Sequence, residues 1–276
     1  MDLSDRLLFW RRPRIGVIQL HGLISARSAG ALNAKAYAPL IERAFRAAGK
    51  GGQVVLDIDS PGGSPVQSDL IATLIRRHAD RAGARVVAVI QEVGASGGYW
   101  IACAADEIFA NPMSVVGSIG VVGGGFGFTE ILARLGVERR LYVAGDNKVR
   151  LDPFRPERAD DVAFVKRVMD DLHTRFKDWV RTRRGARLAQ DDAQLFDGSW
   201  FLGDRARALG LVDGFDDLDG LIKRLGGDRA VARVFRPRRR GLLGRLPRLA
   251  GEALLDAVEE RCLRLGLLAG GPEWWA

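Results

Sequence analysis

The sequence predicts an α/β fold in which buried strands alternate with amphipathic helices. Two segments support this prediction, Gln53–Ile58 and Arg85–Ile90, because each is a short, β-branched and apolar run typical of a strand buried on both faces. Each run is followed by a glycine-rich turn and then by a helical pattern. With 276 residues, the chain can bury a sizeable core as one large domain.

The first elements follow in chain order. The first predicted strand ends at His21, and a helix that Gly49 ends follows it. The apolar face of this helix comprises Leu40, Ile41, Ala44, Phe45 and Ala48. After the strand Gln53–Ile58, Ser64 is a good N-cap and Pro65 suits the first position of a second helix. Its predicted apolar face comprises Val66, Leu70, Ile71, Leu74 and Ile75.

The second half of the chain is predicted in the same way. A helix of small and apolar residues begins directly after Ser96, and Glu138–Val143 has the composition of a strand. A long amphipathic helix is expected from Asp160 to Arg184. Its apolar face comprises Val162, Val165, Met169, Leu172, Phe176 and Trp179. The predicted organisation is an N-terminal segment over residues 1–13, a domain over 14–228, and a basic, amphipathic C-terminal tail over 229–276.

Ser96 is the candidate nucleophile. It lies within Gly94-Ala-Ser-Gly-Gly98, where glycines allow a sharp turn and the free N–H groups of a helix start favour developing negative charge. The Asp59–Ser64 loop has the same character, and two such loops at the carboxyl ends of adjacent strands form the usual ligand crevice of an α/β sheet. One loop would supply the nucleophile and the other an oxyanion-hole donor. The alternative is a plain strand-to-helix turn in which Ser96 is only an N-cap.

A serine nucleophile needs a base. None of the histidines, His21, His78 and His173, has a neighbouring carboxylate at a suggestive spacing, so surface positions are expected for them and a Ser-His-Asp triad is not. Lys148 is the better candidate, because it follows a predicted strand and a turn. A desolvated ammonium can lose its proton near neutral pH and act as a general base, which arginine cannot do.

Motifs in six regions give the chain a resemblance to the signal peptide peptidase A (SppA/SohB-like) family of Ser-Lys serine proteases. It extends from about Arg14 to about Leu225. The matching segments are Ile15–Ile24, Asp59–Ser64, Gly94–Tyr99, Gly117–Val122, Lys148 with Asp152–Pro156, and Ala208–Asp213. The resemblance implies the spiral of strand-strand-helix units that Clp protease and crotonase share. It also implies a homo-oligomer that cleaves signal-peptide-like, membrane-derived or unfolded peptides.

The resemblance also assigns roles to individual residues. Ser96 matches the family's nucleophile and Lys148 its general base. Gly63 and Gly97 match the positions whose backbone N–H groups form the oxyanion hole. Ser118 matches the serine that hydrogen-bonds the lysine and orients it.

Composition argues against several other classes. The chain has two cysteines, Cys103 and Cys262, which we expect to be reduced packing residues. No metal-ligand spacing is present, and Gly120–Phe128 lacks the Lys-Ser/Thr ending of a phosphate loop. We therefore expect no metal and no cofactor.

The sequence also bears on whether the chain crosses or binds a membrane. No run of about eighteen apolar residues occurs, so no transmembrane helix is expected, and the N-terminus does not resemble a secretory signal. We expect a cytoplasmic protein, peripheral on the inner face of the membrane if the tail binds lipid. The chain has a net charge of +8, and its basic residues are most concentrated at the start of the tail, at Arg233, Arg236, Arg238, Arg239, Arg240, Arg245 and Arg248. Membrane-surface binding and packing on a sister subunit both remain open for the tail, whereas nucleic acid is not expected as a partner.

Two other functions remain open at this point. A crotonase-class acyl-CoA enzyme would also use two backbone N–H groups as an oxyanion hole but would need neither Ser96 nor Lys148. A non-catalytic membrane-surface scaffold would use the glycine-serine loops as structure only.

Overall fold

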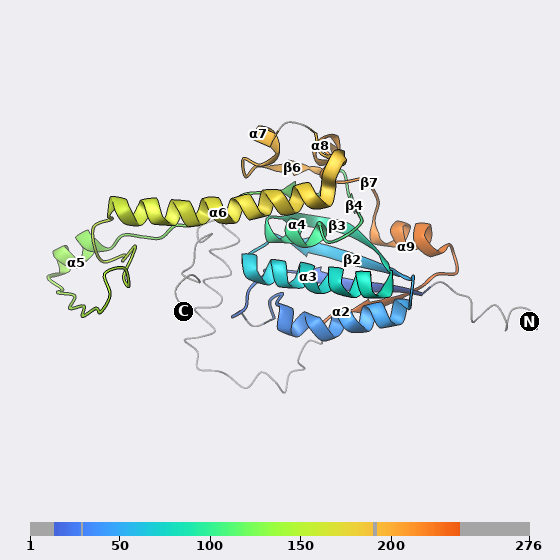
Figure 1. The fold of residues 1–276 in the computed structure, drawn as a ribbon, viewed down its shortest axis with the longest axis horizontal. Helices are drawn as coiled ribbons and strands as arrows, with labels where there is room; N and C mark the ends of the chain where they lie inside the picture. The colour runs from blue at the N-terminus through green and yellow to red at the C-terminus, as the bar shows by residue number, and fades with distance from the viewer. Residues whose placement is uncertain (1–13, 29, 190–191, 238–276) are drawn as a thin grey trace, which may run out of the picture. The chain divides into compact units, whose positions relative to one another are not determined.

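The computed structural model describes residues 14–28, 30–189 and 192–237, and it confirms the α/β fold class (Figure 1). These residues form two compact units, one of residues 14–120 and 176–237 and the other of residues 121–175. Most of the predicted tail, residues 238–276, lies outside the described residues. No helix of the described residues is both long and apolar enough to cross a bilayer.

A mostly parallel sheet organises the first unit. Its strands follow the order β6-β5-β3-β2-β1-β8, while β4 pairs with β3 and with β7. All pairs are parallel except β5 with β6. The strands are β1 (Arg14–His21), β2 (Gln53–Ser60), β3 (Arg85–Ala95), β4 (Glu107–Ala110), β5 (Val115–Gly117), β6 (Trp200–Leu202), β7 (Gly214–Phe215) and β8 (Val231–Phe235).

Strand β3 pairs with β2 on one side and, on the other side, first with β4 and then with β5. Its first part, up to Ile90, pairs with β2 and β4, and its last part, Val93–Ala95, pairs with β5. Between these parts the register against β2 shifts at Ile58 and Ser60. The end of β3, directly before Ser96, therefore lies against β5 and the loop that follows it.

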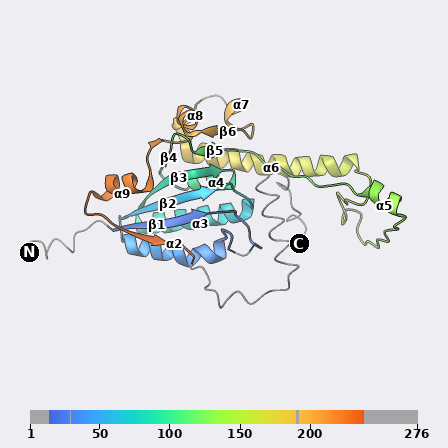
Figure 2. The same cartoon turned by 180° about the vertical axis from the view of Figure 1, so that it is seen from behind.

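Helices cover both faces of this sheet (Figures 1 and 2). Helices α2 (Ala34–Ala48), α3 (Pro65–Ala82) and α4 (Gly97–Ala102) bury one face together with the main core, and α9 (Leu218–Gly226) covers the other through Leu221. The predicted caps are confirmed, because Gly49 ends α2 and the Ser64 side chain accepts a hydrogen bond from the Gln67 N–H.

The predicted apolar face of α3 is partly wrong. Ile71 and Ile75 are buried, but Val66 is 64% exposed and Leu70 is 43% exposed. Ser68 and Ala72 take the buried positions instead. Small side chains face the neighbouring backbone here, because α3 lies close to the loop that carries Gly97.

The sheet also continues past the predicted end of the domain at residue 228. Strand β8 pairs in parallel with β1, so Arg233 is a strand residue. The rest of the first unit contains α7 (Asp192–Leu195), α8 (Gly203–Ala208) and the short 3-10 turn Gly185–Arg187.

The second unit contains α5 (Thr129–Leu135) and the first part of α6 (Ala159–Arg184), whose last part belongs to the first unit. Helix α6 confirms the long helix predicted from Asp160 to Arg184. The strand predicted over Glu138–Val143 is wrong, because these residues are irregular. A strand-like composition makes a strand only where a neighbouring strand pairs with it.

Candidate active site

Ser96 occupies a strained turn between β3 and α4. Its backbone has φ 50° and ψ −122°, a region that a residue with a side chain rarely adopts. Two backbone hydrogen bonds hold it there, from Ser96 N to Gly117 O at 2.9 Å and from Trp100 N to Ser96 O at 2.9 Å. The Ser96 side chain caps no helix N–H, so the reading of Ser96 as a plain N-cap does not account for it.

The Gly62-Gly63 loop lies directly against Ser96 and Gly97. A Cβ on Gly62 would be 2.7 Å from Gly97 N and 2.8 Å from Ser96 Cβ. A Cβ on Gly63, where φ is 135°, would be 2.1 Å from Ile24 O. Both approaches are closer than real Cβ contacts. Glycine at 62 therefore lets this loop meet the Ser96 turn, and glycine at 63 lets it meet the chain at Ile24.

This packing brings two backbone donors together. A Cβ on Gly97 would lie 3.4 Å from Gly63 N, so the Gly63 N–H reaches the side of the Ser96 turn. Within the described residues, neither the Gly63 nor the Gly97 N–H donates a hydrogen bond. Two free N–H groups beside a serine are what an oxyanion hole requires.

Ser118 lies in the loop that supports Ser96. Its neighbour Gly117 accepts the hydrogen bond from Ser96 N, and Ser118 N donates to Ser199 O at 2.8 Å. Ser118 also has a left-handed backbone, with φ 51°. The structure therefore brings Ser96, Gly63, Gly97 and Ser118 into one region of the first unit.

Lys148 belongs to the second unit, so its pairing with Ser96 remains a prediction. The residue is exposed and lies in a turn that is closed by a hydrogen bond from Lys148 N to Gly145 O at 3.1 Å.

The helix behind Ser96 is firmly anchored at its far end. Tyr99 is fully buried and its hydroxyl donates to Leu211 O at 2.7 Å. Trp179 of α6 donates to Trp100 O at 2.9 Å, and Arg183 donates to Cys103 O at 2.8 Å. Cys103 is a buried free cysteine, as predicted, and burial raises the pKa of its thiol to about 12. The second cysteine of that prediction, Cys262, lies outside the described residues.

A His-Asp pair was missed by the sequence reasoning. His21 Nε2 lies 3.1 Å from Oδ2 of the buried Asp57, which also accepts from Gln91 Nε2 at 2.8 Å and Gln19 Nε2 at 3.3 Å. The hydrogen bond to Asp57 raises the pKa of His21. Burial opposes ionisation of Asp57, but the hydrogen bonds from His21 and Gln91 outweigh it and lower the Asp57 pKa. His21 is exposed, as expected, but its pairing with Asp57 was not predicted.

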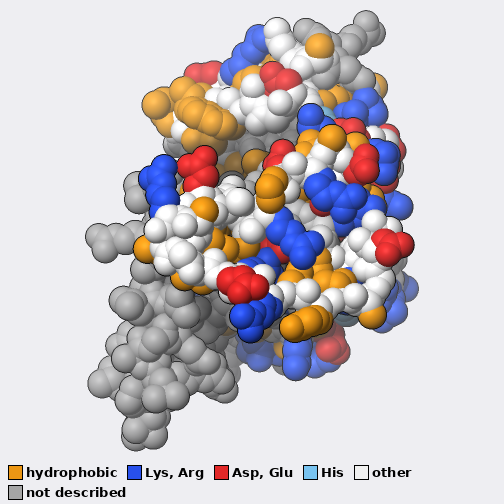
Figure 3. Space-filling model, turned by 90° about the vertical axis from the view of Figure 1, so that its left-hand side faces the viewer, with side chains coloured by type: hydrophobic (Ala, Val, Ile, Leu, Met, Phe, Trp, Pro, Cys, Tyr) orange, Lys and Arg blue, Asp and Glu red, His pale blue; other side chains and the backbone are white. Residues whose placement is uncertain are grey.

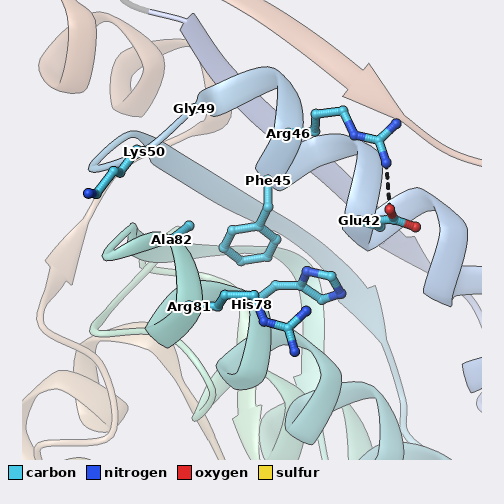
Figure 4. A pocket seen from close by; sticks show the side chains of 8 residues that line it. All are labelled: Glu42, Phe45, Arg46, Gly49, Lys50, His78, Arg81 and Ala82. Carbon is cyan, nitrogen blue, oxygen red and sulfur yellow. Dashed lines mark hydrogen bonds and ion pairs between the residues drawn. The ribbon is translucent and has the colours of Figure 1, made fainter.

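A separate hollow lies between the carboxyl ends of α2 and α3 (Figure 4). Its lining includes Phe45 stacked on His78, with Arg46 paired to Glu42 at its edge. Helices α2 and α3 end where β2 and β3 begin, so this hollow is at the opposite end of the sheet from Ser96. Basic side chains at helix carboxyl ends are explained by the helix dipole alone. Within the described residues, no group of three or more potential metal ligands is present.

An α/β sheet with a strained serine at a strand-to-helix turn and two free N–H groups beside it has the architecture of a serine hydrolase. The family model for peptidase family S49 matches residues 78–232. The chain belongs to this family.

Some relatives of this chain are named as proteases, and others carry the name of an antiporter. A Synechocystis sp. protein named as a protease is 31% identical over 203 residues, covering 73% of this chain and 69% of the relative. A Haemophilus influenzae protein named as a SohB protease is 27% identical over 248 residues, covering 90% of this chain and 68% of the relative. A Brucella abortus protein named Na(+)/H(+) antiporter NhaA is 41% identical over 274 residues, covering 92% of this chain. The match is 37% of that protein, so this chain spans little more than a third of its length.

Proposed function

We propose that the chain is a serine endopeptidase that uses Ser96 as nucleophile and Lys148 as general base. The observation that carries this proposal is the strained Ser96 turn, with the free N–H groups of Gly63 and Gly97 beside it. A strained turn of this kind exposes a serine hydroxyl and fixes its direction. Membership of the S49 family supports the same chemistry.

The reaction proceeds in two halves. The neutral Lys148 amine takes the proton from Ser96 as Oγ attacks the peptide carbonyl carbon, and the Gly63 and Gly97 N–H groups stabilise the oxyanion. The C–N bond then breaks, the leaving amine takes the proton from Lys148, and an ester on Ser96 remains. Water then attacks this ester with Lys148 again as the base, which releases the acid and restores Ser96.

Fluorophosphonate labelling and peptide hydrolysis by purified protein test the dyad. Ser96→Ala and Lys148→Ala should each remove nearly all turnover, and the double variant should lose little more, because the two residues act as one unit. Lys148→Arg should fail as completely, since arginine keeps its charge and cannot serve as a base. Ser118→Ala should lose about 10- to 100-fold, as expected for a group that orients another.

The same experiment separates the other two functions. An acyl-CoA enzyme or a scaffold would resist fluorophosphonate, and peptide hydrolysis would be absent from the wild type. Substantial peptidase activity in folded Lys148→Ala would contradict the dyad.

For the substrate, we infer unfolded or membrane-derived peptides that are cleaved after small or apolar residues. A groove lined by backbone binds an extended peptide by strand addition, which selects for unfolded chains. Profiling with a peptide library tests this. A preference for charged residues at the cleavage position would contradict it.

The proposed setting is the surface of a membrane. Both Brucella relatives carry the name of an antiporter, and this chain aligns with only 37% of the length of each. This association favours a peptidase that works beside membrane proteins. The arginine-rich sequence after residue 232 supports the same setting, since each arginine near an anionic leaflet contributes about 1 kcal/mol. Flotation with anionic vesicles should recover the full chain with the lipid and leave a chain ending at Pro237 behind. Equal recovery of both would contradict attachment through residues 238–276.

A further inference from the structure

The turn that carries Lys148 is tied to helix α6 through Arg150. Arg150 Nη2 donates to Oδ1 of Asn147, the residue directly before Lys148, at 2.5 Å. Arg150 Nη1 donates to Oδ1 of Asp161 on α6 at 3.0 Å. The guanidinium carbon lies 4.5 Å from the centre of the Phe164 ring, also on α6. One guanidinium therefore closes the turn and fixes it to the helix.

Asp161 is the residue on which this attachment depends. It is 5% exposed. A carboxylate is the costliest kind of side chain to bury, and this one is compensated by specific partners. Besides Arg150, its Oδ2 accepts from the Leu151 N–H at 3.4 Å.

Leu151 shows that the turn is held in a defined conformation. Its φ is 51°, a left-handed value that is unusual for leucine. A strained backbone persists only where its surroundings enforce it, and here the Leu151 N–H is bound by Asp161. The carboxylate of Asp161, 13 positions after Lys148, thus holds Arg150 and Leu151 in place, directly after the turn that contains Lys148.

We propose that Asp161 is a positioning residue for Lys148. This inference rests on the proposed function of Lys148 as the general base. A base must be held in reach of the nucleophile, and a misplacement of about 1 Å can cost about 100-fold in rate. Asp161 holds the turn through Arg150 and Leu151, and so fixes the direction in which the Lys148 side chain leaves the backbone.

Asp161→Asn tests this, with Asp160→Asn as the matched control. Asp160 is the neighbouring residue on α6, its side chain is 86% exposed, and its substitution removes the same charge. Asp161→Asn should lower kcat about 10- to 100-fold and leave KM unchanged, because a displaced base slows the chemical step and not substrate binding. The rise of activity with pH should also move to higher pH, because the proposed role needs Lys148 to be desolvated beside the bound substrate and a displaced lysine would stay in water. Asp160→Asn should match the wild type.

A second variant guards against a folding defect. Arg150→Lys keeps the charge but cannot bridge Asn147 and Asp161, so it should reproduce the shifted pH profile. Circular dichroism of each variant reports the folded fraction. A uniform loss of activity with an unmoved pH profile would mean a merely structural role and would overturn the proposal, as would wild-type kinetics in Asp161→Asn. Full activity in Lys148→Ala would instead overturn the dyad itself, and the positioning role with it.

Discussion

At the scale of single residues, His21 makes the folding free energy depend on pH. Its pKa is raised in the folded protein, so its contribution to stability is fully present below its unfolded pKa of about 6.5. This contribution is lost as the pH rises through the folded value. The lowered pKa of Asp57 adds stability above about pH 3.9, which is lost as the pH falls through its folded value.

We therefore predict that His21→Gln destabilises the protein more at pH 5.5 than at pH 9. Urea unfolding at the two pH values measures this difference. His78→Gln is the control, because desolvation lowers the pKa of His78 and its pH dependence has the opposite sign. A His21→Gln effect that is equal at both pH values would contradict the ion pair.

The site residues differ in how far the sequence could predict them. Ser96, Gly63 and Gly97 belong to short glycine-rich motifs whose chemistry is local, so the sequence alone pointed to them. The His21 and Asp57 pair depends on the parallel register of β1 against β2, which places Gln19 beside Asp57 and His21 beside Asp59. His21 and Asp57 are 36 residues apart in the sequence, and that spacing does not indicate how β1 and β2 are aligned.

At the scale of elements, the end of α6 anchors the segment that begins at Ser96. Arg184 is 3% exposed, donates to both carboxylate oxygens of Asp213 at 2.8 and 3.0 Å, and also donates to Gly210 O. Arg183 binds the carbonyl groups at the end of α4. These contacts fix α4 from behind and leave its start free for chemistry.

Arg184→Ala should destabilise the protein by about 3–5 kcal/mol, because it leaves a largely buried carboxylate without its main partner. Arg187 provides the matched control, since it lies 3.4 Å from the same Asp213 but its side chain is 46% exposed. Arg187→Ala should cost no more than about 1 kcal/mol. Urea unfolding of both variants decides the point, and similar losses in the two would contradict the assignment.

Whole elements were predicted best where their own residues decide them. Helix α6 and the start of α3 follow from periodicity and caps, and both are confirmed. The predicted strand Glu138–Val143 and the buried positions of Val66 and Leu70 failed, because pairing and burial depend on neighbours that are distant in sequence. Strand β8 was missed in the same way, since its one arginine, Arg233, was taken as the start of the basic tail.

At the scale of the whole molecule, apolar side chains reach the surface among charged ones (Figure 3). Many of them belong to the second unit, where Phe126, Leu135 and Tyr142 are exposed. Helix α5 has no buried residue. Exposed apolar area of this kind marks surfaces that bind other proteins.

We predict that the protein self-associates and that the second unit contributes to the contact. Light scattering at micromolar concentration should give a mass well above 30.1 kDa. The double substitution Phe126→Glu and Leu135→Glu should lower that mass, whereas Met113→Glu in the first unit should not. A monomeric wild type would contradict this prediction.

Strand β8 has a practical consequence for work on this protein. It covers β1, whose residues Ile15, Val17 and Ile18 are fully buried. A chain shortened at residue 228 would uncover the hydrogen-bonding edge of β1 from Arg14 to Ile18, and an uncovered apolar edge is a template for aggregation. Loss of membrane attachment in such a fragment would be indistinguishable from precipitation. The shortest chain that keeps the sheet closed on this side ends after Phe235.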